Sequence, residues 1–269
     1  MCREYKIIDF HNHIFPDNIA QKAVENIGHY YGISMLGQGT VEALLESISK
    51  INAERYVVHS SATHAGQVKA INDYIAGVIS NYPSMIGFGT LHPGLEEIDS
   101  EVQRIIALGL RGIKLHPEFQ QFFIDDESML PVYAAIEGKL PMLIHMGDKN
   151  KDSSSPSRLA RILDRFPKLV VITAHLGGYQ MWDQSITHLV GRNLFMDTSS
   201  SLTYLSGEKA VEIIRRHGAD KILFGTDFPM WNHQEELNKF LALGLTDAEK
   251  KSILYDNAAG LLGLKTTAS

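Results

Sequence analysis

At 269 residues the chain has the length of one large domain, and an α/β barrel commonly fills this range alone. Hydrophobic residues make up 44% and charged residues 21%, the ordinary composition of a soluble globular protein. The formal net charge of −6, without a Lys/Arg cluster, argues against nucleic acid or an anionic membrane as the main partner.

Few features of the sequence report on cellular location. Cys2 is the single cysteine, so an intrachain disulfide is impossible and a reducing compartment is expected. The first residues run directly into a predicted strand without a signal-peptide apolar region. No apolar stretch approaches the roughly 18 residues that span a bilayer. These features predict a cytoplasmic protein that has no membrane partner.

Eight short runs rich in Val, Ile, Leu and Phe alternate with amphipathic stretches, as in βα units of a parallel sheet. The predicted strands are Lys6–His13, Arg55–His59, Met85–His92, Gly112–His116, Pro141–His145, Leu169–His175, Asn193–Asp197 and Lys221–Asp227. The predicted helices are Val41–Asn52, Gly66–Asn81, Leu95–Leu108, Met129–Glu137, Ser157–Phe166, Met181–Val190, Ser206–His217, His233–Leu243, Asp247–Leu254 and Asn257–Leu262. Eight repeats predict a (β/α)8 TIM barrel, one domain over residues 1–269.

One long segment, Ile14–Gly39, interrupts the repeat after the first strand. It is expected to contain a helix at Asn18–Asn26, and the rest is expected to form a lid over the barrel mouth. Thr40 is the predicted N-cap of the helix that follows. The absence of a glycine-rich dinucleotide motif after the first strand weakens the alternative of an open Rossmann sheet.

Histidines gather at the ends of the predicted strands. Seven of the 12 histidines lie at such ends, and the eighth strand ends in Asp227: His11, His13, His59, His92, His116, His145 and His175. In a barrel the carboxyl ends of all strands open onto one face, where reacting groups gather. So many imidazoles on different strands are hard to explain by packing, and they predict a metal site at the C-terminal face.

The first strand contains the strongest local signal, Asp9-Phe10-His11-Asn12-His13. Residues i and i+2 share one face of a strand, so His11 and His13 point the same way and can share one ion. Asp227 ends a buried strand, and a buried carboxylate requires a cation or a base beside it. Asp9 is expected to line a polar layer of the barrel rather than to support the ligands.

Five motifs in this order resemble those of the amidohydrolase superfamily, specifically the amidohydrolase-2 branch, which also holds metal-dependent aromatic-acid decarboxylases. They are DFHNH, GIKLHP, LIHMGD, TAHLGG and FGTDFP, and they span nearly the whole chain. The resemblance implies a metal ion held by His11 and His13 of the first strand, His145 of the fifth and Asp227 of the eighth. His175 then ligates a second ion or, in a mononuclear site, polarises the substrate or an activated water.

A carboxylated lysine on the fourth strand marks the binuclear members of this family. Lys114 occupies that strand, but an ion pair or a substrate carboxylate is the expected partner, so one divalent ion is predicted and a second stays an alternative. Mixed His and carboxylate ligation suits Zn²⁺, with Mn²⁺ or Fe²⁺ as alternatives. Asp227 is the expected general base, and His175 is expected to stabilise an oxyanion or to orient water.

Four further residues are candidates for substrate binding: His116, Lys114, Ser199 and Trp231. The leading predicted activity is hydrolysis of a small amide, cyclic amide, ester or lactone through a metal-activated water. The alternative is non-oxidative decarboxylation of an aromatic or unsaturated acid, and a non-catalytic metal-binding barrel is a third. The expected partner is a small molecule, and a homodimer is the commonest assembly for such a chain.

Overall fold

The computed structural model describes residues 5–264, and the chain forms two compact units. The first unit is Met1–Val58 together with Thr198–Ser269, and the second is His59–Asp197. Cys2, on which the expected reducing compartment rests, lies outside the described residues. That residues 1–269 act as a single domain stays a prediction.

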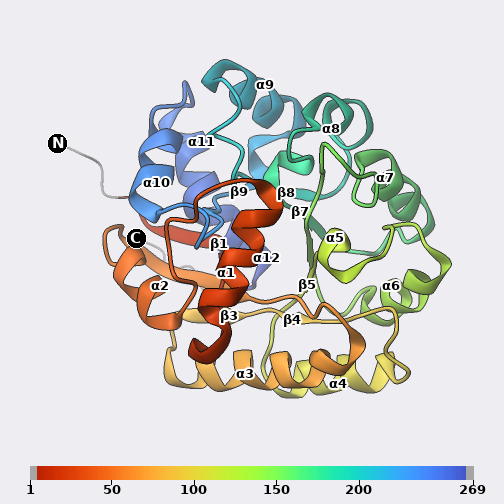
Figure 1. Cartoon of the computed structure of the whole chain (residues 1–269). Coiled ribbons are helices and arrows are strands. Elements are labelled where there is room, and N and C mark those ends of the chain that lie inside the picture. The colour runs from red at the N-terminus through yellow and green to blue at the C-terminus, as the bar shows by residue number, and fades with distance from the viewer. Residues whose placement is uncertain (1–4, 265–269) are drawn as a thin grey trace. The chain divides into compact units, whose positions relative to one another are not determined.

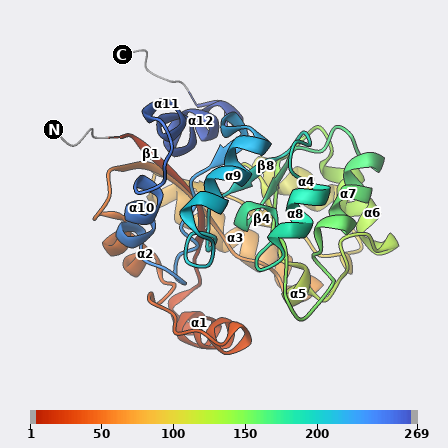
Figure 2. The same cartoon turned by 90° about the horizontal axis from the view of Figure 1, so that it is seen from above.

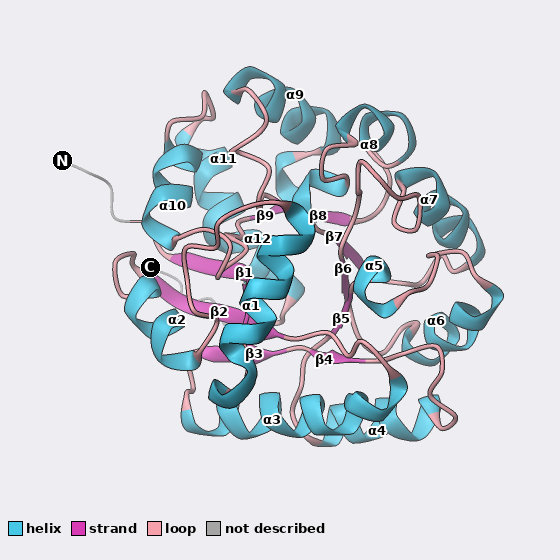
Figure 3. Ribbon diagram, in the orientation of Figure 1, coloured by secondary structure: helices cyan, strands magenta, loops and turns pink. Residues whose placement is uncertain are grey.

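The second unit contains six strands, and those from β4 to β8 run parallel to one another. They are β3 (Met85–Gly87), β4 (Gly89–Thr90), β5 (Ile113–Leu115), β6 (Met142–Ile144), β7 (Val171–Thr173) and β8 (Phe195–Asp197). From β4 to β8 each strand pairs with the next in chain order, and β5 to β8 lie side by side in Figure 3. The register aligns Leu115 with Ile144 and Ile144 with Thr173, so the polar residues that follow these strands start at one level.

The helices of the second unit alternate with its strands. They are α3 (Val68–Asn81), α4 (Ile98–Ala107), α5 (Pro117–Gln120), α6 (Leu130–Ile136), α7 (Pro156–Arg165) and α8 (Trp182–His188), with short helical turns η1 (Ala65–Gln67), η2 (Glu127–Met129) and η3 (His175–Gly177). Apolar residues at helical spacing, such as Leu159 and Ile162 of α7, are buried. Helices α7 and α8 lie next to each other (Figure 1). Burial of one apolar face therefore positions each helix.

The first unit holds both ends of the described chain. Its elements are β1 (Ile7–His13), α1 (Asp17–Tyr31), α2 (Val41–Ile48), β2 (Ala53–His59), α9 (Gly207–His217), η4 (Ala219–Lys221), β9 (Ile222–Leu223), α10 (His233–Leu241), α11 (Asp247–Lys251), the π-helical η5 (Ser252–Asp256) and α12 (Asn257–Leu261). Helices α1 and α12 lie at opposite ends of this unit (Figure 2). Three backbone hydrogen bonds tie β1 to residues 224–228: Phe10 N to Phe224 O, His13 N to Phe228 O, and Asp227 N to His11 O.

The predicted strands all appear, mostly in shorter form, and one of them is divided. Met85–His92, predicted as one strand, forms β3 and β4 with a break at Phe88. At this break the side chain of Phe88 is buried. Its ring occupies the space that a side chain at Gly112 would need. Among residues 5–264, no helix is both long and apolar enough to cross a membrane.

The segment Ile14–Gly39 is more helical than the sequence predicts. Helix α1 begins one residue before the predicted helix and continues to Tyr31, where Gly32 ends it with a φ of 67°. The end of the segment contacts the chain just after Asp227, because Gly37 N donates to Pro229 O at 2.9 Å. Thr40 caps α2 as predicted, its hydroxyl accepting from Ala43 N at 3.1 Å. The role of this segment as a lid stays a prediction.

Candidate metal centre

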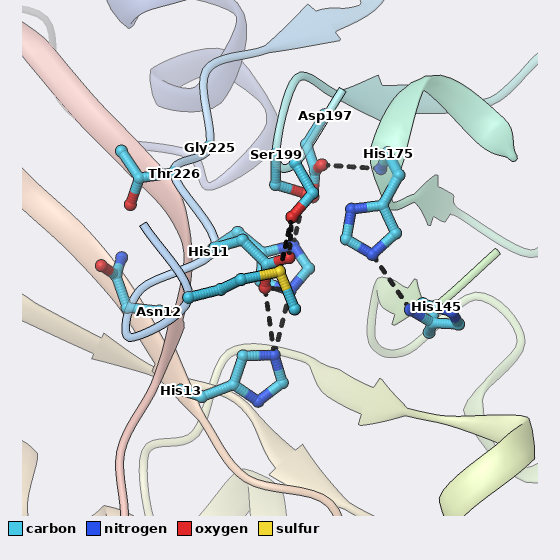
Figure 4. Close-up of polar contacts among 12 residues, drawn as sticks. His11, Asn12, His13, His145, His175, Asp197, Ser199, Gly225 and Thr226 are labelled. Atoms are coloured by element: carbon cyan, nitrogen blue, oxygen red, sulfur yellow. Dashed lines mark hydrogen bonds and ion pairs between the residues drawn. The ribbon is translucent and has the colours of Figure 1, made fainter. Parts of the chain in front are cut away.

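Three of the four predicted metal ligands converge within the first unit. The Nε2 atoms of His11 and His13 are 3.2 Å apart. Asp227 Oδ1 lies 3.3 Å from His11 Nε2 and 3.5 Å from His13 Nε2. Figure 4 shows both imidazoles turned toward this common point. Because side chains alternate between the two faces of β1, His11 and His13 lie on the same face. The backbone hydrogen bond from Asp227 N to His11 O brings the Asp227 carboxylate beside them.

The spacing of these three atoms fits a single divalent cation. Donor atoms that share one tetrahedral ion at bond lengths of ~2.1 Å lie about 3.4 Å from one another. The observed separations of 3.2, 3.3 and 3.5 Å match this value. His11 is fully buried and Asp227 is nearly so, so a cation between them would offset the cost of burying the carboxylate.

Neighbouring groups fix the orientation of the His11 ring and its strand. Ser199 Oγ lies 3.0 Å from His11 Nδ1, which leaves His11 Nε2 directed at the other ligands. Asp9 Oδ1 accepts hydrogen bonds from the backbone N–H groups of His11 and Thr226 at 3.0 and 3.1 Å. Asp9 is buried, as a polar layer of the barrel requires, and it also holds the backbone of the predicted ligand His11. Ser199 contacts a predicted ligand, and its role in substrate binding stays a prediction.

Two predicted site residues of the second unit also meet. His175 Nε2 lies 3.0 Å from His145 Nδ1, and the His175 backbone N–H donates to Asp197 Oδ1 at 3.0 Å (Figure 4). His145 Nε2 lies 2.9 Å from the carbonyl oxygen of Gly147. A carbonyl can only accept, so His145 carries its proton on Nε2 and its lone pair on Nδ1.

The electrostatics of the second unit keep His145 neutral. Burial lowers the pKa of His145 well below its ordinary value, and the charge of neighbouring His116 lowers the pKa further. The Glu118 carboxylate opposes this shift without reversing it. A neutral imidazole with its lone pair on Nδ1 is the form that ligates a metal ion. His145 is therefore chemically suited to the ligand role, and its membership in the four-residue set, with His11, His13 and Asp227 of the first unit, stays a prediction.

Sequence reasoning missed the part played by Glu118. Its Oε1 accepts hydrogen bonds from the hydroxyls of Ser153 and Ser154, and its Oε2 lies 3.4 Å from His116 Nδ1. His116, Glu118 and His145 form a buried group with donor atoms close enough to suggest a second ion. That assignment does not fit, because the Gly147 carbonyl engages His145 Nε2 and because the two imidazoles stack face to face, 4.0 Å apart at 9°.

The turn that contains Gly147 requires glycine at this residue. Its φ is 85°, and a methyl group there would lie 2.5 Å from Tyr179 N and 2.6 Å from Tyr179 O. We expect Gly147→Ala to lower the free energy of unfolding by about 3 kcal/mol, from backbone strain and overpacking together. Urea denaturation measures this.

Gly109→Ala is the matched control for that substitution. Gly109 has a similar φ of 79°, but a methyl group there meets nothing within 4 Å. It should lower the free energy of unfolding by about 1 kcal/mol, the cost of the backbone conformation alone. Equal losses in the two variants would show that the contact with Tyr179 does not constrain this turn.

The remaining predicted site residues differ in burial. Lys114 of β5 is fully buried, whereas Arg111 and Lys149, two other cations that the sequence offers, are exposed. His59 is buried at the end of β2. His92 is partly exposed, and its Nδ1 accepts from Gly94 N at 3.0 Å, so this ring supports its own turn.

Comparison with known proteins identifies the family of the chain. The Amidohydro_2 family, whose description is "Amidohydrolase", matches residues 8–264. The chain belongs to this family. It is accordingly an enzyme of the amidohydrolase superfamily, as the motifs indicate.

Solved structures show the fold. A 5-carboxyvanillate decarboxylase from Sphingomonas paucimobilis is 16% identical, with a TM-score of 0.73, over 97% of this chain and 100% of its own. An uncharacterised TIM-barrel protein from Bordetella bronchiseptica is 21% identical, with a TM-score of 0.74, over 96% and 99%. A dihydroxybenzoic acid decarboxylase from Polaromonas sp. JS666, with bound manganese and 2-nitroresorcinol, is 14% identical, with a TM-score of 0.73, over 98% of each chain. The fold of the amidohydrolase is the predicted TIM barrel.

One curated relative is similar in sequence over a shorter stretch. It is a gamma-resorcylate decarboxylase from Polaromonas sp. JS666, 26% identical over 123 residues. The alignment covers 38% of this chain and 37% of the relative.

Proposed function

We propose that this amidohydrolase is a divalent-metal-dependent decarboxylase, which replaces the carboxylate of a hydroxylated aromatic acid by a proton. The observation that carries the proposal is the ligand triangle of His11, His13 and Asp227, whose spacing fits one ion. Two of the three named structures with this fold are decarboxylases of aromatic acids, and one of these two contains bound manganese. They favour the second of the two activities expected from the sequence.

The ion is proposed to be held by His11, His13 and Asp227, with His145 as the fourth ligand that the motifs imply. Mn²⁺ is the first choice because manganese is bound in a solved relative, and Zn²⁺ and Fe²⁺ remain alternatives for this ligand set. A single ion is proposed, since the stacked imidazoles of His116 and His145 do not suit a second.

Decarboxylation breaks the bond between the ring carbon and the carboxylate carbon, leaves the electron pair on the ring and releases carbon dioxide. When bound, the ion supplies positive charge that holds and polarises the oxygens of the acid. Asp227 is proposed to hold the proton that replaces the carboxylate on the ring carbon, and His175 to donate a hydrogen bond to a substrate oxygen. One proton from solvent restores Asp227 after each turnover.

The burial of Lys114 supports an acid as substrate. Lys114 is buried, whereas the cations Arg111 and Lys149 are exposed. An ammonium group inside a protein interacts with an anion far more strongly than one in water does. We therefore assign Lys114 to the acidic group of the substrate, one of the two partners expected from the sequence.

Release of carbon dioxide distinguishes the proposed activity from hydrolysis. Protein loaded with Mn²⁺ is expected to release carbon dioxide from members of a panel of hydroxybenzoates, and the same protein treated with a chelator is expected to release none. A parallel panel of amides and lactones tests hydrolysis, which would use the same ligands. Turnover of the second panel alone, or full activity after metal removal, would contradict the proposal.

A further inference from the structure

We infer that Ser200 and Trp231 are positioning residues, which hold Asp227 so that it offers one oxygen atom to the metal ion. This inference rests on the proposed metal centre. All three residues belong to the first unit and lie in the two loops that follow β8 and β9. Trp231 Nε1 is 2.9 Å from Ser200 Oγ, and the Ser200 hydroxyl donates to Asp227 Oδ2.

The chemistry of the three groups determines the direction of each hydrogen bond. An indole N–H can only donate, so Ser200 Oγ accepts from Trp231. Before it takes up the proton assigned to it, Asp227 is an ionised carboxylate, which can only accept, so the single hydroxyl hydrogen of Ser200 points at Asp227 Oδ2. Met230 Sδ, 3.2 Å from the same hydroxyl, is a weak acceptor and competes poorly.

The hydrogen bonds from Trp231 to Ser200 and from Ser200 to Asp227 give the two oxygens of Asp227 different partners. Oδ2 receives the serine hydroxyl, whereas Oδ1 faces His11 Nε2 and His13 Nε2 at 3.3 and 3.5 Å. Without the serine, the carboxylate could rotate about its terminal bond and present both oxygens to the ion. The contact therefore favours ligation through Oδ1 alone and sets where that oxygen lies.

The backbone supports a role for this contact beyond packing. Asp227 has a φ of 65° and Ser200 a φ of 53°, both in the left-handed region that side-chain-bearing residues rarely adopt. Such conformations cost free energy and persist where the surrounding structure requires them. Serine occupies residue 200, where glycine would fit the backbone more easily, and the hydroxyl is what glycine lacks.

The indole of Trp231 is held in place by its own neighbours. The ring of Tyr204 meets it edge-on at a centroid distance of 6.4 Å, and Lys239 Nζ lies 5.1 Å from its centre. These contacts fix the N–H that points at Ser200. Trp231, predicted to bind substrate, is thereby connected to Asp227 through one hydroxyl group.

Ser200→Gly separates the positioning role from a structural one, because the two predict opposite changes. The thermal midpoint of the metal-free variant should equal or exceed that of the unaltered protein, since glycine adopts this φ without strain. Its affinity for Mn²⁺, measured by calorimetric titration of chelator-treated protein, should fall roughly tenfold to a hundredfold, as for other groups that orient a metal ligand. Unchanged affinity would overturn the inference.

Two further variants complete the test. Trp231→Phe keeps the ring and removes the N–H, and it should weaken Mn²⁺ binding between about twofold and tenfold, the worth of one neutral hydrogen bond. Ser49→Ala, which removes an exposed hydroxyl elsewhere in the same unit, should bind as the unaltered protein does. If the unaltered protein binds no Mn²⁺, the proposed metal centre fails. If it binds and all variants bind equally, the positioning role alone fails.

Discussion

Asp227→Asn is expected to abolish turnover and to weaken metal binding in the same protein. The amide keeps the shape of the carboxylate but loses the negative charge that faces His11 and His13, and it cannot carry the proton assigned to Asp227. Loss of a general acid commonly costs 10²–10⁴-fold, so kcat/KM should fall by at least about 10³-fold. Steady-state kinetics at saturating Mn²⁺ and metal analysis of the purified variant measure the two effects.

The variant should still fold, which makes the result interpretable. Asn tolerates the left-handed backbone region well, so the φ of 65° at residue 227 adds no new strain. Asp220→Asn, an exposed acid in the same unit, is the matched control for loss of one charge. Full kcat/KM in Asp227→Asn would rule out the assigned acid, and full metal content would rule out the assigned ligand.

The parts of the site that lie on strands could be predicted from the sequence. The alternation of β1 places His11 and His13 on one face, and the structure brings their Nε2 atoms to 3.2 Å. The runs that end at His116 and His145 appear as β5 and β6, aligned in parallel register. In these segments a period of two determines where each side chain points, and the sequence displays that period directly.

The parts that lie in loops could not be predicted, because no period governs the direction of their side chains. Ser200 contacts Asp227 because its backbone adopts a left-handed conformation, with a φ of 53°. Nothing in the neighbouring sequence predicts this conformation. Glu118 turns back from the short helix α5 to Ser153 and Ser154, which are far along the chain. The proton on His145 Nε2 follows from a carbonyl two residues later, a contact that depends on the φ of Gly147.

His175→Asn is expected to lower turnover while leaving the metal content intact. His175 belongs to the second unit, and its Nε2 lies 3.0 Å from His145 Nδ1. Loss of one group that stabilises developing charge costs about 10²–10³-fold in kcat. The substitution suits the backbone, since His175 has a φ of 61°, which Asn adopts readily.

Measuring both kcat and bound metal in His175→Asn distinguishes two possible roles of His175. A ligand and a group that acts on the substrate both lower kcat, but only the ligand changes how much metal the protein retains. Reduced kcat with one equivalent of Mn²⁺ places His175 on the substrate side of the reaction. Loss of metal relative to the unaltered protein would instead make His175 a ligand, and a fall from two equivalents to one would restore the binuclear alternative. Asp227→Asn should lose both turnover and bound metal, whereas His175→Asn should lose turnover alone. The two variants together therefore separate residues that bind the ion from residues that act on the substrate acid.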